Sequence, residues 1–413
     1  MTRMFGGRPE RVAWTIAACL VAFMAAFAAG CGSSSSSGSR NTDMLQKVGK
    51  MEGQLNLIEW PGYVEPQWTK PFEKKTGCQV NGKDAGTSDQ MVQLMRTGQY
   101  DGVSASGNAT ERLVDGGDVS PVNTSLVPNY KTIFPDIKNQ PYNTFDGVHY
   151  GIPHGRGANL LMWNPNDVKP APDSWSIILN PTDAAKYKGR ISAYDDPVYI
   201  ADAAVYLKAH NPSLKITNPY ELDSKQFGAA VNLLKEQRPN VGEYWSSATK
   251  QISSFANGDD AVGTTWQYQY FALKGEGKPV ATIPAEPLGF LPKEGATGWS
   301  DTWMISSHAK NPNCMYAWMN WITSPKANAM VAQFFGEAPA QTKACDPNTL
   351  VAAAKAINVP PNPKFCNQYH AATPSFWKRV YYWQTPTKDC GDSRGNVCMD
   401  YNDWVNAWTE VKG

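Results

Sequence analysis

Short runs of apolar residues recur along most of the chain, and their period switches between that of a strand and that of a helix. Residues 54–60 alternate apolar and polar positions as a half-buried strand does. Residues 68–76 have helical spacing and stop at Gly77, a typical helix end. Residues 88–98 predict a second helix and residues 100–103 the next strand. Strands interleaved with helices indicate an α/β fold with a mostly parallel sheet, which places ligands at the carboxyl ends of its strands.

The length and the later pattern predict two lobes. At about 150 residues per domain, a chain of 413 residues exceeds one small core. Residues 150–164 are typical of a segment that passes from one lobe to the next, and a helix of about three turns is expected at 312–322. We therefore expect these parts: a lipoprotein signal peptide (1–30), a lipidated cysteine and Ser/Gly-rich linker (31–50), a first lobe (51–155 and 286–336), a second lobe (156–285), and a disulfide-rich C-terminal segment (337–413) packed on the second lobe.

The first 31 residues predict export. Arg3, Arg8 and Arg11 precede an uncharged apolar stretch at 12–29, and small residues lead into Cys31. This order is typical of a signal peptide, and a cysteine directly after the small residues indicates attachment of lipid to its thiol. The alternative is an uncleaved transmembrane helix, although the stretch is at the short limit of about 20 residues. We expect an exported lipoprotein anchored on the outer face of the cytoplasmic membrane, in a periplasm or at a cell surface.

The charge of the chain argues against some partners. Removal of residues 1–30 takes three Arg and one Glu from 38 basic and 37 acidic residues, which leaves a formal charge of −1. Such a balance gives no reason to expect nucleic acid or an anionic membrane surface as a partner. No second stretch of the sequence is long and apolar enough to cross a membrane.

Disulfides are expected from the cysteines that remain after Cys31 and the discarded Cys19. These are Cys78, Cys314, Cys345, Cys366, Cys390 and Cys398. An even number outside the cytosol suggests disulfides, and six cysteines allow 15 pairings. Cys390–Cys398 closes a short loop, Cys345–Cys366 follows by proximity, and Cys78–Cys314 is left; the alternative is that some cysteines stay free and buried. No C-x2-C or H-x3-H spacing predicts a metal site.

Eight short landmarks recur in order over residues 54–345. They are 60–64, 100–103 with Ser106, 150–153, 174–175, 187–191, 194–196, 263–266 and 299–301. By these landmarks the chain resembles the PotD/PotF-like family, the spermidine/putrescine-binding proteins of ABC importers. The resemblance implies an α/β, two-lobed periplasmic-binding-protein-like (type II) fold with a hinge and a central ligand cleft.

The resemblance also implies a function. It predicts an extracytoplasmic substrate-binding lipoprotein that captures a polyamine or a similar organic cation and delivers it to the permease and ATPase subunits of an ABC importer. No enzyme activity, cofactor or metal is implied, and a monomer is expected.

A set of ligand contacts follows from the resemblance. A polyamine needs carboxylates for its ammonium groups and flat aromatic walls for its methylenes, with cation–π attraction where an amine faces a ring. The family's aromatic positions match Trp60, Tyr63, Trp266 and Trp299, its acidic positions match Asp196 and Asp301, and a polar contact matches Ser106.

Several positions depart from the family pattern. Gly62 and Tyr199 stand where the family commonly has Glu, and Asn108 and Glu337 stand where it has Tyr. Tyr199 and Glu337 are included among the site candidates because of these positions. Since the number and spacing of carboxylates measure the number and spacing of amines, a diamine such as putrescine, or another organic cation, fits as well as spermidine.

Each candidate also has a purely structural explanation. Trp60 at the end of a strand is often core, and Asp196 can cap the helix that follows it. Trp266 follows a Gly-Thr-Thr run and Trp299 is expected in a Gly/Ser loop, both poor positions for core residues. Asp301 can be a turn residue, but Trp-x-Asp in an extended segment puts both side chains on one side. We expect Asp301 to be the main amine anchor.

Other functions remain open. A secreted enzyme can use Asp/Glu pairs on sugars, but no Gly-x-Ser-x-Gly or HExxH motif occurs. A sensor lipoprotein that presents its ligand to another protein would have the same fold. Among binding proteins, Tyr381–Tyr382 is the kind of pair that binds ferric iron. Thiamine or a betaine-like cation would use the aromatic residues with fewer carboxylates.

Overall fold

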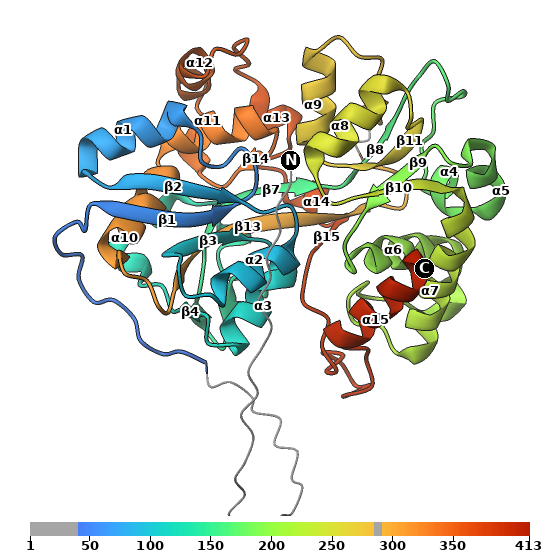
Figure 1. The fold of residues 1–413 in the computed structure, drawn as a ribbon, viewed down its shortest axis with the longest axis horizontal. Helices are drawn as coiled ribbons and strands as arrows, with labels where there is room; N and C mark the ends of the chain where they lie inside the picture. The colour runs from blue at the N-terminus through green and yellow to red at the C-terminus, as the bar shows by residue number, and fades with distance from the viewer. Residues whose placement is uncertain (1–39, 285–290) are drawn as a thin grey trace, which may run out of the picture. The chain divides into compact units, whose positions relative to one another are not determined.

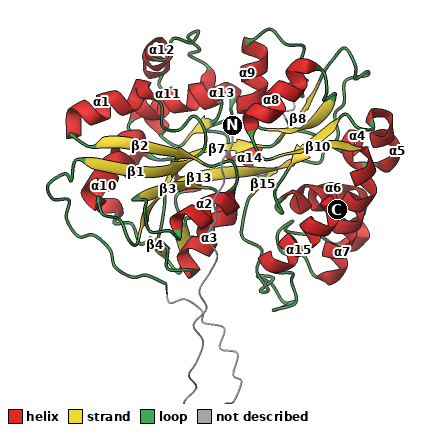
Figure 2. Cartoon of the chain, in the orientation of Figure 1, coloured by secondary structure: helices red, strands yellow, loops and turns green. Residues whose placement is uncertain are grey.

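The computed structural model describes residues 40–284 and 291–413 (Figure 1). The predicted signal peptide and the predicted lipidation at Cys31 lie outside these residues. Within them, the predicted alternation of strands and helices is confirmed: the strands form two larger sheets, with helices on both sides (Figure 2). No helix in this part of the chain is long and apolar enough to cross a membrane.

The first sheet has the strand order β14-β7-β13-β3-β1-β2, with β4 and β15 also paired to β13. Its strands are β1 (Gln54–Glu59), β2 (Gln79–Asp84), β3 (Gly102–Ala105), β4 (Val119–Ser120), β7 (Ile152–Ala158), β13 (Ala296–Ser306), β14 (Ala338–Pro339) and β15 (Val380–Tyr382). β1 runs parallel to β2 and β3, whereas β13 is antiparallel to β3 and β7. The expectation of a mostly parallel sheet is wrong. The chain returns from the second sheet into β13, and β13 enters the first sheet antiparallel to its neighbours β3 and β7.

Helices of the first sheet follow the sequence pattern closely. They are α1 (Pro66–Thr76), α2 (Ser88–Met95), α3 (Gly107–Asp115), α10 (Pro312–Ile322) and α11 (Pro325–Phe335). α1 ends because Gly77 takes a left-handed conformation, with φ of 78°, which glycine adopts without strain. Phe72 of α1 packs edge-on against Trp318 of α10. This aromatic contact joins the two helices into one buried layer.

The second sheet has the strand order β10-β9-β11-β8-β12. Its strands are β8 (Leu160–Trp163), β9 (Ile191–Tyr194), β10 (Val241–Trp245), β11 (Val262–Thr265) and β12 (Ala281–Thr282). Its helices are α4 (Ser176–Leu179), α5 (Pro181–Ala184), α6 (Tyr199–His210), α7 (Ser224–Gln237), α8 (Ala248–Asn257) and α9 (Gln267–Gly275). The first eight residues of α6 are all buried, so this helix forms the centre of the second lobe.

The chain passes between the two sheets at Asn159. Ala158 is paired with Gly298 in the first sheet, and Leu160 is paired with Thr265 in the second. The side chain of Asn159 donates to the Thr297 hydroxyl at 2.6 Å. Because one residue separates the sheets here, small changes in its backbone angles move one sheet relative to the other, as in a hinge.

The C-terminal segment contacts both sheets. β15 is paired with β13 of the first sheet, and α12 (Pro347–Ala356) packs on α11. Two short helices follow, α13 (Phe365–Gln368) and α14 (Pro374–Trp377). The last helix, α15 (Tyr401–Lys412), lies beside α7 of the second sheet (Figure 1). This segment therefore links the two sheets.

Three disulfides bind distant parts of the chain together. The predicted pairs Cys78–Cys314, Cys345–Cys366 and Cys390–Cys398 are all confirmed. Cys78–Cys314 joins residues 236 positions apart and ties the end of α1 to α10. The other two pairs close short loops within the C-terminal segment, 21 and 8 positions long.

Candidate functional site

A small aromatic cavity lies where strands of both sheets end. Its lining residues are Trp60 after β1, Ser106 after β3, Trp266 after β11, Trp299 and Asp301 of β13, Phe335 and Trp383. The carboxyl ends of strands are where α/β sheets commonly bind ligands. The cavity measures about 10 Å³, roughly the space of one water molecule. A larger ligand therefore enters only when the lining side chains move apart.

Strand β13 places Trp299 and Asp301 on one face, because residues i and i+2 of a strand point the same way. Trp299 is thus in a strand and not in the predicted Gly/Ser loop. The glycines of this region serve close packing instead of turns: a Cβ at Gly157 of β7 would lie 2.3 Å from the Trp299 indole. Only glycine at this position leaves the indole room to lie against β7.

Asp301, Tyr63 and Glu337 form one buried hydrogen-bonded group. Tyr63 Oη lies 2.7 Å from Asp301 Oδ2 and 2.8 Å from Glu337 Oε2. Ser106 Oγ donates to Asp301 Oδ1, and all four side chains are buried. A tyrosine hydroxyl carries one proton and can donate only one of its two bonds. One of the two carboxyl groups must therefore be protonated and donate to Tyr63.

Burial indicates which carboxyl group holds the proton. Burial raises the pKa of Glu337 well above its usual value. Burial also raises the pKa of Asp301, but only to about 7, because hydrogen bonds from Ser106 and Tyr63 to Asp301 oppose the rise. His154 Nε2 lies 3.6 Å from Glu337 Oε1, but burial lowers the pKa of this histidine to about 3, so it is neutral at pH 7. Glu337 is thus the protonated partner, and Asp301 is the group that ionises when a cation arrives.

Gly155 of β7 makes room for the Glu337 carboxyl group. A Cβ at Gly155 would lie 2.3 Å from the Glu337 carboxyl carbon. Any larger residue would push Glu337 away from Tyr63. In the sequence, Glu337 stood out only as a departure from the family pattern, whereas its position behind Asp301 follows from this packing.

Indole rings that follow strands of the two sheets meet edge to face in the lining of the cavity. The ring centroids of Trp60 and Trp266 are 5.6 Å apart, with planes at 76°. Trp266 is held from behind by Trp245 at 5.0 Å, and Trp299 meets Phe335 at 5.5 Å. The faces of indole rings attract cations, and Trp is the strongest of the aromatic side chains in this respect. The cavity therefore combines one carboxylate with several cation-attracting walls.

Two of the predicted contacts, Asp196 and Tyr199, do not line the cavity. Asp196 Oδ1 accepts the N–H of Val198 at 2.9 Å, which closes a turn just before α6 begins and does not cap the helix. Tyr199 lies in the first turn of α6, where its hydroxyl accepts from Gln237 and its ring packs against Trp408. The Tyr199 side chain is thus held by contacts with α7 and α15.

Of the other predicted contacts, five line the cavity and Tyr63 and Glu337 stand directly behind Asp301. Sequence reasoning missed Phe335 and Trp383. Phe335 ends α11 one residue before Gly336, so it had the pattern of an ordinary core position. Trp383 lies in the C-terminal segment, directly after β15, and this segment matched no landmark.

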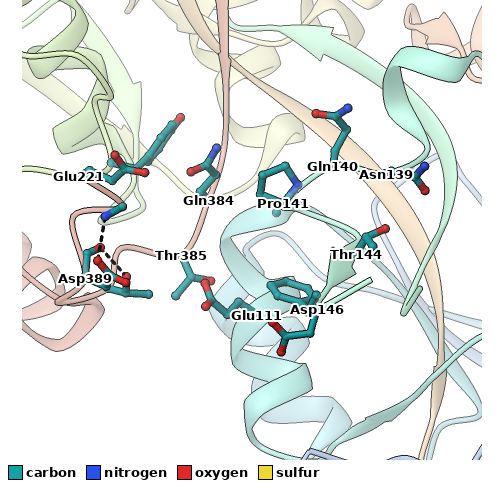
Figure 3. Close-up of a pocket in the computed structure, with 15 residues that line it drawn as sticks. Glu111, Asn139, Gln140, Pro141, Thr144, Asp146, Glu221, Gln384, Thr385 and Asp389 are labelled. Carbon is teal, nitrogen blue, oxygen red and sulfur yellow. Dashed lines mark hydrogen bonds between the residues drawn. The ribbon is translucent and has the colours of Figure 1, made fainter. Parts of the chain in front are cut away.

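Figure 3 shows a second, larger cavity. Gly107 and Gln384, which line it, adjoin Ser106 and Trp383 of the aromatic cavity. It measures about 460 Å³. Its carboxylates are Glu111, Asp146, Glu221 and Asp389. Arg40 pairs with Asp146 at 2.6 Å, and burial followed by repulsion from Asp115 raises the pKa of Glu111 to about 7.

The tyrosine pair considered for iron lies beside cationic side chains. The Tyr382 hydroxyl accepts from Arg156 at 3.3 Å, and Lys208 Nζ is 5.4 Å from the centre of the Tyr381 ring. Over residues 40–284 and 291–413, no group of three or more His, Cys, Asp or Glu side chains is arranged to hold a metal ion.

Comparison with known proteins agrees with this architecture. The model of the family described as bacterial extracellular solute-binding protein matches residues 67–358. The spermidine/putrescine-binding periplasmic protein of Escherichia coli K12 is 26% identical over 286 residues, which are 68% of this chain and 76% of that protein. The putrescine-binding periplasmic protein PotF of the same strain is 26% identical over 301 residues, 70% of this chain and 79% of that protein.

A solved structure shows the same fold. The TpPotD lipoprotein of Treponema pallidum superposes with a TM-score of 0.66 at 19% identity, over 87% of this chain and 99% of that chain. The two-lobed type II fold expected from the sequence is thereby confirmed.

Proposed function

The chain belongs to the family of bacterial extracellular solute-binding proteins, and from this membership we propose that it captures a small organic cation for an ABC importer. An extracytoplasmic solute-binding role comes with the family. Beyond that role, we propose that the ligand is an amine and that the residues of the aromatic cavity bind it. The protein would then deliver the amine to a permease and an ATPase. The similar proteins of Escherichia coli K12 are named for binding spermidine and putrescine, so these two amines are the first to test.

One observation supports a cationic ligand above all others. Asp301 is buried at 2% exposure within a wall of indoles, and no Lys or Arg among the described residues contributes to its electrostatic environment. A buried carboxylate without a cation is costly, which is why burial raises its pKa to about 7. An ammonium group in the cavity would remove this cost and would add cation–π attraction from Trp60, Trp266 or Trp299.

The hinge at Asn159 fits capture by closure. The cavity is too small to admit a ligand in the present arrangement, and its walls come from both sheets. Separation of the sheets would admit the cation, and closure would desolvate its contact with Asp301 and strengthen it. A lipid anchor at Cys31 would hold the protein next to its permease.

The test is a titration of the purified full chain, followed by tryptophan fluorescence and calorimetry. Putrescine, spermidine, spermine, betaine, thiamine and ferric citrate are the ligands to compare. Asp301→Asn is expected to abolish binding of every amine. Asp260→Asn is the matched control, because burial also raises the pKa of Asp260 to about 7 but this residue does not line the cavity. Failure of all the cations to bind below millimolar concentrations would rule the proposal out.

A further inference from the structure

Helix α15, near the C-terminus, is fixed to the second lobe at both of its ends. Near its last turn, Trp408 Nε1 and Lys412 Nζ donate to Asp195 Oδ1, at 3.0 and 2.7 Å. Asp195 directly follows β9 of the second sheet. Just before the helix begins, the Met399 N–H donates to Leu222 O at 2.9 Å. The first turn of α15 therefore moves with the second lobe.

Tyr401, the first residue of α15, contacts two helices of the first lobe. Its hydroxyl donates to Asp89 Oδ1 of α2. Its ring lies beside the guanidinium of Arg112 from α3, with Arg112 Cζ 3.9 Å from the ring centroid. Arg112 Nη1 is also 2.6 Å from the same Asp89 oxygen. Tyr401, Asp89 and Arg112, here called the clasp, thus combine a charge-assisted hydrogen bond, a cation–π contact and an ion pair.

The clasp is shielded from water to a degree that makes its contacts count. Only 18% of the Arg112 side chain and 34% of the Asp89 side chain are exposed. A fully exposed ion pair contributes little because water screens it, whereas partly buried charges attract each other more strongly. The clasp is therefore stronger than an ordinary contact between two surfaces.

Other contacts between the lobes lead from the aromatic cavity to the clasp. The Trp60 ring of the first lobe meets the Trp266 ring of the second, and the Tyr194 ring is 5.2 Å from that of Trp266. Tyr194 Oη in turn donates to Gly86 O of the first lobe at 3.2 Å, three residues before Asp89. All of these residues lie at or just after the carboxyl ends of strands. The cavity and the clasp thus lie between the same two faces.

Opening of the lobes would break the clasp. Rotation at Asn159 that draws the carboxyl ends of the two sheets apart also draws Tyr401 away from Asp89. The clasp consists only of side chains of the protein, so it holds the lobes together whether or not a cation is in the cavity. A contact made in the closed arrangement and lost in the open one shifts the equilibrium toward closure.

We infer that Tyr401 is a positioning residue for ligand capture, which holds the two lobes closed and slows the release of a cation bound at Asp301. The effect on release rests on the proposed function, whereas the effect on closure does not. Tyr401 lies beyond the family match, which ends at residue 358. The C-terminal segment therefore adds a device that controls opening of the binding fold.

The first experiment measures closure without any amine. Genetically encoded spin labels at Gln67 of α1 and Ser253 of α8, both exposed, report the distribution of distances between the lobes in the purified full chain. Wild type is expected to show a closed population. Tyr401→Phe keeps the ring and loses the hydroxyl, so the ratio of closed to open molecules should fall about tenfold. Tyr401→Ala also loses the cation–π contact, and the ratio should fall about fivefold further.

Two further variants separate the clasp from a general loss of packing. Asp89→Ala should lower the ratio of closed to open molecules, and adding Tyr401→Phe to it should have no further effect, because the hydroxyl has already lost its partner. Tyr316→Phe is the matched control, because the Tyr316 hydroxyl accepts the Asn123 N–H at 2.9 Å within the first lobe. This variant should leave the ratio unchanged.

The second experiment measures release of putrescine by stopped-flow tryptophan fluorescence. Release from Tyr401→Phe should be about tenfold faster than from wild type, because opening no longer breaks the bond to Asp89. Wild type without a closed population, an unchanged ratio in both Tyr401 variants, or equal rates of release would overturn the inference. Absence of amine binding in wild type would instead overturn the proposed function, and the distance measurements would still decide whether the clasp closes the lobes.

Discussion

Replacement of Asp301, the proposed ligand anchor, is expected to stabilise the unliganded protein at alkaline pH. In the folded chain burial raises the pKa of Asp301 to about 7, whereas aspartate in an unfolded chain has a pKa of about 3.9. The difference of about three pKa units corresponds to roughly 4 kcal/mol. Because the folded state binds this proton more tightly, the cost is absent below about pH 4, grows between pH 4 and pH 7, and is complete above pH 7.

Asp301→Asn removes this cost and keeps the local hydrogen bonds. The asparagine oxygen can accept from Ser106, and its amide group can donate to Tyr63, which is then free to donate to Glu337. We expect the free energy of unfolding of the variant to exceed that of wild type by up to about 4 kcal/mol more at pH 8 than at pH 4.

The assay is unfolding in urea at pH 4 and pH 8, followed by tryptophan fluorescence without ligand. Titration of Tyr63, Glu337 and His154, which surround the carboxyl group, affects both proteins and largely cancels in the comparison. Asp260→Asn should show a pH-dependent gain of its own but should keep amine binding. A difference between Asp301→Asn and wild type that is the same at both pH values, or that favours wild type at pH 8, would refute the reasoning.

Other predictions follow from the same contacts. Amine affinity should rise about tenfold per pH unit between pH 5 and pH 7 and level off above, because the ligand binds ionised Asp301; a flat calorimetric profile contradicts this. The Glu337→Gln variant should bind amines with an affinity within a few-fold of wild type, because the glutamine amide still donates to Tyr63. Glu337→Ala removes this partner of Tyr63, so thermal melts should show a free energy of unfolding lower by about 1–3 kcal/mol. Replacing Cys78 and Cys314 by Ser should lower the free energy of unfolding in urea by about 5 kcal/mol, and replacing Cys390 and Cys398 should lower it by about 2.5 kcal/mol. The difference is expected because the first disulfide closes a loop of 236 positions and the second a loop of 8. Equal losses would contradict the entropic explanation.

Much of the fold could be predicted because its signals are local. Helix α10 occupies residues 312–322 as its apolar spacing indicated, and α1 ends at Gly77. The disulfide pairs followed from loop length and proximity. Strand direction could not be predicted in the same way. The antiparallel entry of β13 depends on where the chain crosses between the sheets, which no local pattern records.

The candidate site could likewise be predicted where its signals are local, and not where it depends on long-range packing. Trp299 and Asp301 were predicted to share one side of an extended segment, and the two-residue period of a strand brings both to the cavity. Asp196 matched a landmark and Tyr199 departed from the family pattern, but neither lines the cavity: Asp196 accepts from the Val198 N–H, and the Tyr199 ring packs against Trp408. Their position depends on the direction in which one helix leaves its strand, and that direction is a property of the packed lobe.

The sequence by itself determined the family and the alternation of strands and helices, and it predicted an aspartate among tryptophans as the core of the site, because each of these depends on neighbouring residues or on ordered landmarks. The tertiary structure decided which side chains meet. It placed Glu337 behind Tyr63 so that one carboxyl group keeps its proton. It also brought Trp383, 82 positions after Asp301 in a segment without landmarks, into the wall of the same cavity. These long-range contacts form only when the two sheets pack around them.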